Sequence, residues 1–293
     1  MKIKESLSWR IFNVFNICFM LLLCFIMIYP FWYVICASFS NGDLLLGHSK
    51  ALFAPIGFTT DAYIGIFKNP MIMQGYINTL IIVVGGVAVN MIITTMGAYT
   101  LSRKDVYWNK LIMKLVTITM FFNGGLIPSY LLISRTLGLN NSFLAVILPL
   151  AVSTYNLIVL KTSFSQVPES LVESALLEGA GHFRVMAQVV VPLSKSILAV
   201  ILLYYTVDRW NSWFNASIYL KDRALYPLQL ILREILIQND VGAMSDPTAT
   251  DQYALSETIK YATIVVATVP ILIVYPFVQK FFTKGVMIGA VKE

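Results

Sequence analysis

Charged residues are scarce in this chain. Only 12% of its 293 residues are Asp, Glu, Lys or Arg, whereas 58% are hydrophobic and the mean hydropathy is +0.75. A soluble globular domain carries about 25% charged residues. The composition excludes an ordinary soluble domain and predicts an all-α polytopic membrane protein.

Cysteine and histidine are also few. The three cysteines, Cys18, Cys24 and Cys36, lie in or beside the first apolar run, too far apart along a helix to pair easily. We interpret them as small hydrophobic side chains. Neither His48 nor His182 stands in a metal-ligand spacing. The sequence therefore predicts no metal site.

The chain also lacks its own source of energy. It contains no G-x-x-x-x-G-K-[ST] nucleotide motif and no nucleophile–base pair, so we expect no catalytic residue, no bound cofactor and no enzyme activity. The centres of its apolar runs contain no Asp, Glu, Lys, Arg or His, which proton and sodium relays need. A transporter built this way needs a separate partner to drive it.

Six apolar runs are long enough to cross a bilayer, which requires about 20 residues each. The third has a weak point at Asn123-Gly124-Gly125, and the fourth contains Pro149. Lys2, Lys4 and Arg10 precede the first run, which is too long for a signal peptide and predicts an uncleaved helix. The predicted spans are residues 11–39, 80–101, 111–133, 143–160, 192–213 and 259–282.

The distribution of Lys and Arg predicts the orientation of these spans. With the N-terminus inside, thirteen of the 21 cations fall on the cytoplasmic side, and Arg209 is counted among those outside. Both termini and residues 167–192 are then cytoplasmic, whereas 40–78 and 208–257 are outer loops. Within the second outer loop, the amphipathic stretch 225–237 is expected on the outer surface. This topology explains the net charge of +6 without any nucleic acid partner.

The polar segment 167–192 has the pattern of two short helices joined by glycines. Pro168 and Glu169 suit a first helical turn, and the helical pattern breaks at Gly179 and Gly181. After the break, one apolar face is predicted from the spacing of Phe183, Met186, Ala187 and Val190. A helix–glycine–helix element on the cytoplasmic side is suited to docking into a soluble partner.

The same segment carries a family motif. Glu173-Ser174-Ala175 and Glu178-Gly179-Ala180, followed eight residues later by Val189-x-Val191-Pro192, resemble the EAA loop of ABC-importer permeases, E-A-A-x-x-D-G-A-x8-I-x-L-P. The resemblance implies that this loop couples the permease to an ATPase. Glu173 would pair with a cation of the ATPase or cap within the loop. The implied coupling residues are Glu173, Ser174, Ala175, Glu178, Gly179, Ala180, Gly181, His182, Phe183, Arg184, Met186 and Pro192.

Residues 120–132, 210–226 and 279–293 resemble the second permease subunit of carbohydrate importers of the maltose-permease-like superfamily. The resemblance implies a type I ABC importer permease fold: one transmembrane domain over residues 1–293 in a bacterial cell membrane. The implied partners are a different permease subunit in a heterodimer, two cytosolic ATPase subunits that carry ATP and Mg, an extracytoplasmic solute-binding protein and the lipid bilayer. The implied substrate is an oligosaccharide or polysaccharide fragment. The tail, 283–293, would reach the ATPase.

Uncharged polar and aromatic residues in or near the spans have two interpretations each. Asn90, Asn123, Tyr155 and Asn156 either join helices or line a path for hydroxyl-rich solutes. Trp210 and Trp213, with Phe214 and Tyr219, form either an interfacial aromatic belt or a gate that stacks on sugars. Two other functions stay open: an ABC permease for a non-sugar solute, and a membrane sensor or scaffold that does not transport.

Overall fold

The computed structural model describes residues 6–245, 257–273 and 276. Within them the chain is helical and contains no strand, which confirms the all-α prediction. The chain divides into two compact units, Met1–Asn69 with Leu232–Thr268, and Pro70–Ile231 with Val269–Glu293. A single domain over residues 1–293 stays a prediction, and the tail at 283–293 lies outside the described residues.

The first unit begins with one long apolar helix, α1 (Leu7–Ser38), which Ser6 caps by accepting a hydrogen bond from the Trp9 amide. Nearly all of α1 is exposed, and only its last turn is buried, where Cys36 packs in a cluster with Leu45 and Leu52. The short helices α2 (Gly42–Leu46) and α3 (Asp61–Lys68) follow. An exposed apolar helix of this length is suited to lipid or to another membrane subunit.

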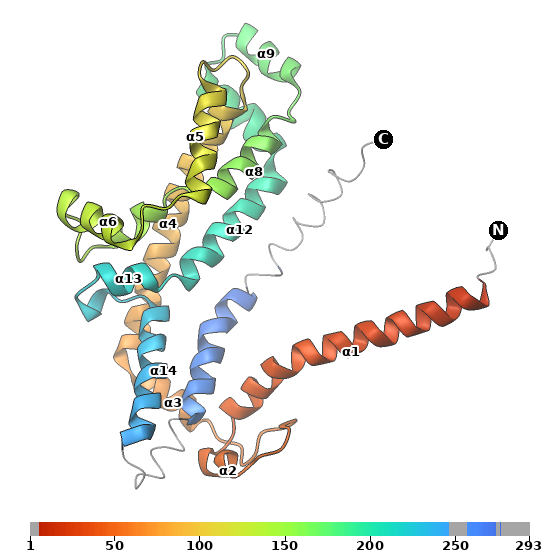
Figure 1. The fold of residues 1–293 in the computed structure, drawn as a ribbon, viewed down its shortest axis with the longest axis vertical. Helices are drawn as coiled ribbons and strands as arrows, with labels where there is room; N and C mark the ends of the chain where they lie inside the picture. The colour runs from red at the N-terminus through yellow and green to blue at the C-terminus, as the bar shows by residue number, and fades with distance from the viewer. Residues whose placement is uncertain (1–5, 246–256, 274–275, 277–293) are drawn as a thin grey trace. The chain divides into compact units, whose positions relative to one another are not determined.

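The second unit is organised around α4 (Pro70–Ser102). Helices α8 (Thr154–Phe164) and α12 (Lys195–Asn211) run beside it (Figure 1). The helices approach closely where α4 carries glycine: a Cβ at Gly97 would stand 3.2 Å from the Leu157 side chain of α8. Small residues at such contacts let membrane helices pack with their backbones near one another.

The predicted third span is a bent pair of helices, and whether the pair crosses the membrane as one span stays a prediction. Helix α5 (Asn109–Phe121) is followed by α6 (Leu126–Leu131) and a π-helical turn (Leu132–Thr136), which bend away by 112°. The break falls at the predicted weak point. Gly125 has φ +88°, and the Asn123 side-chain oxygen accepts a hydrogen bond from its amide at 3.0 Å.

The predicted fourth span is also bent. Helix α7 (Phe143–Ile147) and a 3-10 turn (Leu148–Leu150) meet α8 at 51°, and the Ser153 hydroxyl caps α8. Proline at position 149 cannot donate to a helix ladder, so the chain breaks its hydrogen bonding there. The break leaves the carbonyl groups around Leu150 to be satisfied by other helices.

Two helices among the described residues, α1 and α4, are long and apolar enough to cross a membrane by themselves. The number of possible spans among the described residues rises to five if each of three bent helix pairs counts as one span. Two of these pairs are the predicted third and fourth spans, and in the remaining pair residues His182–Leu193 meet α12 at 90°. The predicted fifth span therefore begins only at Lys195. The predicted sixth span is helical over residues 257–273, and its end lies outside the described residues apart from residue 276.

After α12, a short helix α13 (Phe214–Tyr219) and a 3-10 turn (Arg223–Leu225) lead to α14 (Leu228–Ser245). The stretch 225–237 was expected on the outer surface, but its first part is buried at Leu228, Leu230 and Ile231. Gly75 of α4 permits this packing, because a Cβ there would lie 2.6 Å from Ile231. The first turn of α14, at Leu228 and Ile231, thus packs against α4.

Candidate functional site

The predicted docking segment folds as two arms joined by an elbow. The first arm is α9 (Glu169–Leu177). The second is α10 (His182–Val185), which continues through a π-helical turn (Met186–Val190) into α11 (Val191–Leu193). Figure 1 shows α9 at one end of the second unit, beyond the ends of α4 and α5. We call residues 177–183, between and including the tips of the arms, the elbow.

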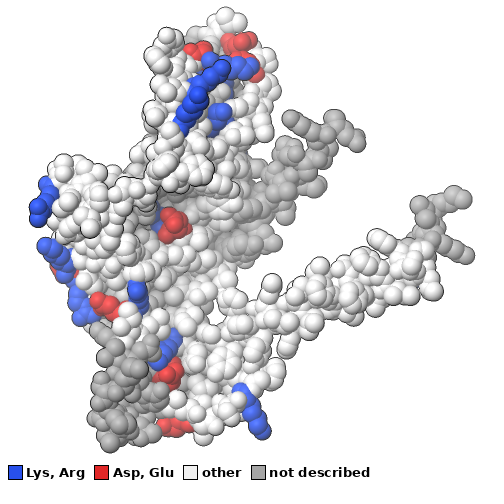
Figure 2. Space-filling model, in the orientation of Figure 1, with Lys and Arg blue, Asp and Glu red and all other residues white. Residues whose placement is uncertain are grey.

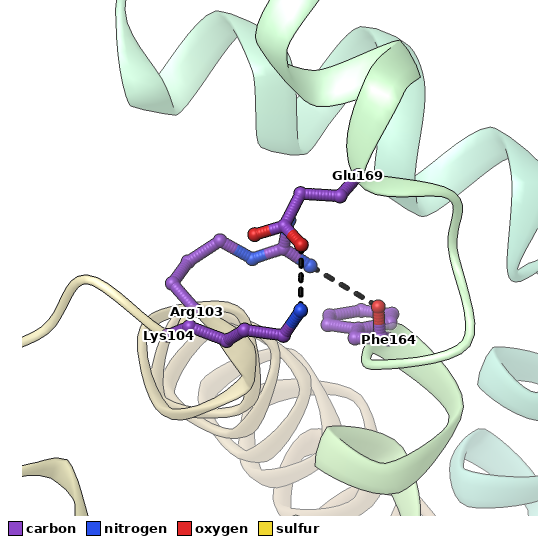
Figure 3. A network of polar contacts seen from close by, with 4 residues as sticks. All are labelled: Arg103, Lys104, Phe164 and Glu169. Atoms are coloured by element: carbon purple, nitrogen blue, oxygen red, sulfur yellow. Dashed lines mark hydrogen bonds and ion pairs between the residues drawn. The ribbon is translucent and has the colours of Figure 1, made fainter.

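The end of α4 holds the first arm. Figure 3 shows Lys104 reaching Glu169, the first residue of α9, with Nζ 2.6 Å from Oε2. Beside it, Arg103 donates from Nη2 to the backbone oxygen of Phe164, at the end of α8, over 3.1 Å. The hydrogen bond to Glu169 raises the pKa of the exposed Lys104 above its ordinary value.

The same end of α4 also holds the second arm. The Tyr99 hydroxyl and His182 Nδ1 share a hydrogen bond of 3.2 Å, and the Arg103 guanidinium lies 5.3 Å from the centre of the Tyr99 ring. Both arms are therefore fixed to the last turn of α4 and the residue or two after it.

Gly179 forms the turn of the elbow. Its φ is +84°, in the left-handed region that favours glycine, and its amide donates to the Leu176 carbonyl over 3.0 Å. The next amide, of Ala180, reaches back to Ala175 over 3.1 Å, so the end of α9 is closed by backbone hydrogen bonds. Gly181 is different, because its backbone is extended with φ −71° and ψ 158°.

Two large apolar side chains stand out into solvent at the elbow. Leu177 is 90% exposed and Phe183 is 71% exposed. The predicted apolar face of the second arm is therefore wrong in part: Met186 and Val190 are buried, but Phe183 and Ala187 are exposed. The π-helical turn adds a residue to the helical repeat and shifts the faces. Exposed apolar groups on a protruding element are typical of a docking surface.

Charged groups surround this surface. Figure 2 shows Lys and Arg side chains beside Asp and Glu side chains at the end of the second unit that carries α9. A cavity of about 620 Å³ lies between residues 102–105 and the arms, lined also by Glu173 and His182. Glu173 forms no hydrogen bond or ion pair with any residue that the structure describes. Its carboxylate is thus open to a partner.

The other predicted coupling residues lie around the elbow without a common contact. The Ser174 hydroxyl donates to the Ser170 carbonyl at 2.8 Å, and Arg184 donates to the Gln188 side chain at 2.9 Å. Glu178 and Pro192 are exposed, and Ala175 and Ala180 are half-buried. The coupling role of all these residues stays a prediction.

Of the residues predicted for a substrate path, Asn90 has its side-chain amide occupied within the fold. It is buried, its Nδ2 donates to the Leu150 carbonyl at 2.6 Å, and its Oδ1 accepts from Arg209 at 2.8 and 3.2 Å. These contacts join α4 to α12 and to the break before α8. The geometry favours the joining interpretation for this residue.

The remaining polar residues form no hydrogen bond with Asn90 among the described residues. Asn123 is exposed and forms the turn before Gly125, whereas Asn156 is buried in α8. Tyr155 is exposed, and its ring lies 6.4 Å from that of Tyr204. A substrate path lined by these residues stays a prediction.

The aromatic residues near the end of α12 are likewise divided. Trp210 is buried with its ring 6.3 Å from that of Tyr76, and Tyr219 is buried and stacks on Tyr130. The rings of Trp213 and Phe214 instead contact each other, with their planes at 88° and their centres 5.5 Å apart. Both residues line a cavity of about 280 Å³.

Sequence reasoning counted Arg209 with the cations of the outer segments but did not predict its burial. The residue is only 1% exposed. The guanidinium donates to the carbonyl groups of Val146, Ile147 and Leu150 at 2.8–3.0 Å, in addition to Asn90. A buried cation is stable where carbonyl dipoles of a helix end surround it.

A signal for this packing exists in the sequence. Gly75, Gly86 and Gly97 recur every eleven residues, which places them on one face of α4. Gly86 is the position opposite Arg209, since a Cβ there would lie 2.9 Å from Arg209 Nε. Next to it, the Tyr205 hydroxyl bonds to Thr94 at 2.7 Å and accepts from the Ser153 amide at 3.1 Å. A glycine face of this kind indicates a close neighbour.

Known proteins with a similar structure and sequence are transporter subunits. A crystal structure of a bacterial ABC transporter involved in the import of the acidic polysaccharide alginate contains a similar chain, with a TM-score of 0.85, 30% identity, and coverage of 96% of this chain and 100% of that one. YtcP of Bacillus subtilis (strain 168), a polygalacturonan/rhamnogalacturonan transport system permease protein, is 39% identical over 97% of this chain and 99% of its own length. The chain belongs to the ABC-transporter permeases.

A second relative agrees with this family. The permease is 40% identical to protein LplC of Bacillus subtilis (strain 168), over 97% of this chain and 95% of that protein. No protein-family model matches the chain. As a transport permease with long exposed apolar helices, it is a multi-pass protein of the bacterial cell membrane.

Proposed function

We propose that this permease forms half of the translocation path of an ATP-driven carbohydrate importer and receives its driving force through the elbow. Its substrate class is taken from relatives named for polysaccharide transport. The observation that carries the coupling role is the protruding elbow, where Leu177 and Phe183 are exposed, with Glu173 exposed on the first arm beside it. Tyr99 of α4 contacts the second arm, and Lys104, just after α4, contacts the first.

The proposed assembly contains a second, different permease subunit, two cytosolic ATPase subunits with ATP and Mg, and an extracytoplasmic solute-binding protein. The five candidate spans, with each bent pair counted once, and the helix over residues 257–273 are compatible with six crossings. The distribution of Lys and Arg supports placing both termini in the cytoplasm. In this topology α9 and α10 face the ATPase. The lack of a nucleotide motif in the sequence supports the need for that partner.

The mechanism follows from the way the elbow is anchored. When ATP closes the ATPase dimer, a docked elbow moves with its subunit, and α4 and α12 move with the elbow. The cavity between the two permeases then opens outward and receives the carbohydrate, and hydrolysis restores the inward-open state. Such a cycle requires that ATP bind one of the two states more tightly than the other.

The first test is ATP hydrolysis by the complete reconstituted transporter. We expect the rate to rise when carbohydrate-loaded binding protein is added, and to stay at its basal level with empty binding protein. A complex whose ATPase subunits are catalytically inactive provides the control for contaminating hydrolases. A membrane sensor or scaffold would give no response to loaded binding protein, and a permease for another solute would respond only to binding protein loaded with an amino acid or a peptide.

A further inference from the structure

A second pocket of the second unit has the chemistry of a carbohydrate site. Its volume is about 280 Å³, at the lower limit for ligand pockets, so it would hold one ring-sized group rather than a whole chain. It lies where the end of α12, the start of α13 and the break before α8 meet. Its lining consists of Leu150, Asp208, Asn211, Ser212, Trp213, Phe214 and Asn215.

The aromatic part of the lining consists of two rings that are nearly perpendicular. The ring planes of Trp213 and Phe214 form an angle of 88°, and Trp213 is half-buried whereas Phe214 is exposed. Trp213 is held in place by packing against the buried cluster of Ile82, Val146 and Ala216. A fixed aromatic face beside polar groups suits the apolar C–H face of a sugar ring.

The polar part of the lining is rich in hydrogen-bond acceptors. Asp208 is exposed, and its carboxylate forms no hydrogen bond or ion pair with any residue in the described part of the chain. Asn211 donates from Nδ2 to the Val207 carbonyl at 2.9 Å, which leaves its Oδ1 as an acceptor. Acceptors of this kind bind the hydroxyl groups of a sugar.

The lining contains no cation. Arg209, the neighbour of Asp208 in sequence, turns its guanidinium into the interior toward Asn90 and the carbonyl groups of the break. The Arg209 guanidinium still interacts electrostatically with Asp208, but its N–H groups donate to buried acceptors, so no cation of the lining can pair with a ligand carboxylate. Like charges a few ångströms apart repel by about 1–4 kcal/mol near a protein surface.

We propose that this pocket binds an uncharged, hydroxyl-bearing sugar residue and rejects a uronate, with Asp208 as the discriminating group. The proposal rests on the carbohydrate function proposed above and narrows its substrate class. It separates this permease from the structural neighbour named for import of the acidic polysaccharide alginate.

The test uses two probes that differ at one carbon, methyl α-galactopyranoside and methyl α-galacturonide. Each is added to the purified complete transporter, and saturation transfer from protein to ligand is measured by NMR. We expect the neutral probe to bind about tenfold or more tightly than the acidic one. Asp208→Asn is expected to remove most of this preference, and Phe214→Ala is expected to weaken both probes equally.

Asp222→Asn is the matched control, because it removes an acid from the outer segment while an amide can still cap the turn that Asp222 now caps. It should leave the preference unchanged. Equal binding of the two probes, tighter binding of the galacturonide, or an Asp208→Asn variant with the wild-type preference would each overturn the proposal. If hydrolysis still responds to loaded binding protein in that case, the transport function stands and only the pocket assignment fails.

Discussion

Replacing Gly179 by Val is expected to lower carbohydrate uptake by about tenfold or more, while the permease still inserts and assembles. Valine is strained at φ +84°, at a cost of about 1–3 kcal/mol, and the elbow escapes this strain by changing its turn. The second arm then presents Phe183 at another angle. Uptake into proteoliposomes and the response of ATP hydrolysis to loaded binding protein should fall together, whereas the amount of assembled complex should not change.

Two further variants separate backbone strain from added bulk. Gly181→Val places the same side chain two residues away, also with open space around its Cβ, but on an extended backbone that valine adopts readily. It is expected to retain most of the uptake. The Gly179→Asn variant should also retain most of the uptake, because Asn tolerates the left-handed region of backbone conformation. Normal uptake by Gly179→Val would contradict a coupling role for the elbow.

Replacing Arg209 by Met is expected to destabilise the permease by about 3 kcal/mol. The change leaves the Asn90 side-chain oxygen and the carbonyl groups of Val146 and Ile147 without their donor in a dry interior. Thermal unfolding of the purified transporter, followed by a thiol-independent fluorescence signal, should show a melting temperature lower by several degrees.

Arg135→Met is the control, since Arg135 is an exposed cation whose loss should change stability by no more than about 0.5 kcal/mol. Arg209→Lys provides a milder variant in case Arg209→Met does not assemble. Lysine keeps the charge but lacks the planar guanidinium group, so the melting temperature of Arg209→Lys is expected to lie between those of the wild type and Arg209→Met. A melting temperature unchanged in both Arg209 variants would mean that this network does not stabilise the fold.

The sequence was sufficient for local features of the elbow. Proline before Glu169 and glycine at 179 predicted where α9 begins and ends, because a helix start and a left-handed turn depend on single residues. The sequence did not reveal that Lys104 contacts Glu169, 65 residues away. Such a contact depends on how α4, α8 and α9 pack.

Hydropathy was less reliable for the shape of the spans. It found the apolar run over residues 111–133 and the weak point within it, but a sum of apolar residues carries no information on direction. The 112° bend arises from the local turn at Asn123 and Gly125. The burial of Arg209 was not predicted for a related reason: the carbonyl groups that satisfy its charge are supplied by tertiary packing.

The most direct test of the docking claim is a crosslink from the elbow. In a variant whose native Cys18, Cys24 and Cys36 are replaced by Ser or Ala, Leu177→Cys provides one exposed thiol at the elbow, and Leu137→Cys provides another on the predicted outer side. With a short thiol-to-amine crosslinker, Leu177→Cys is expected to join the permease to the ATPase subunit. A membrane-impermeant maleimide should label Leu137→Cys, but not Leu177→Cys, in intact cells. Labelling of Leu177→Cys from outside, or no crosslink to the ATPase, would contradict the account.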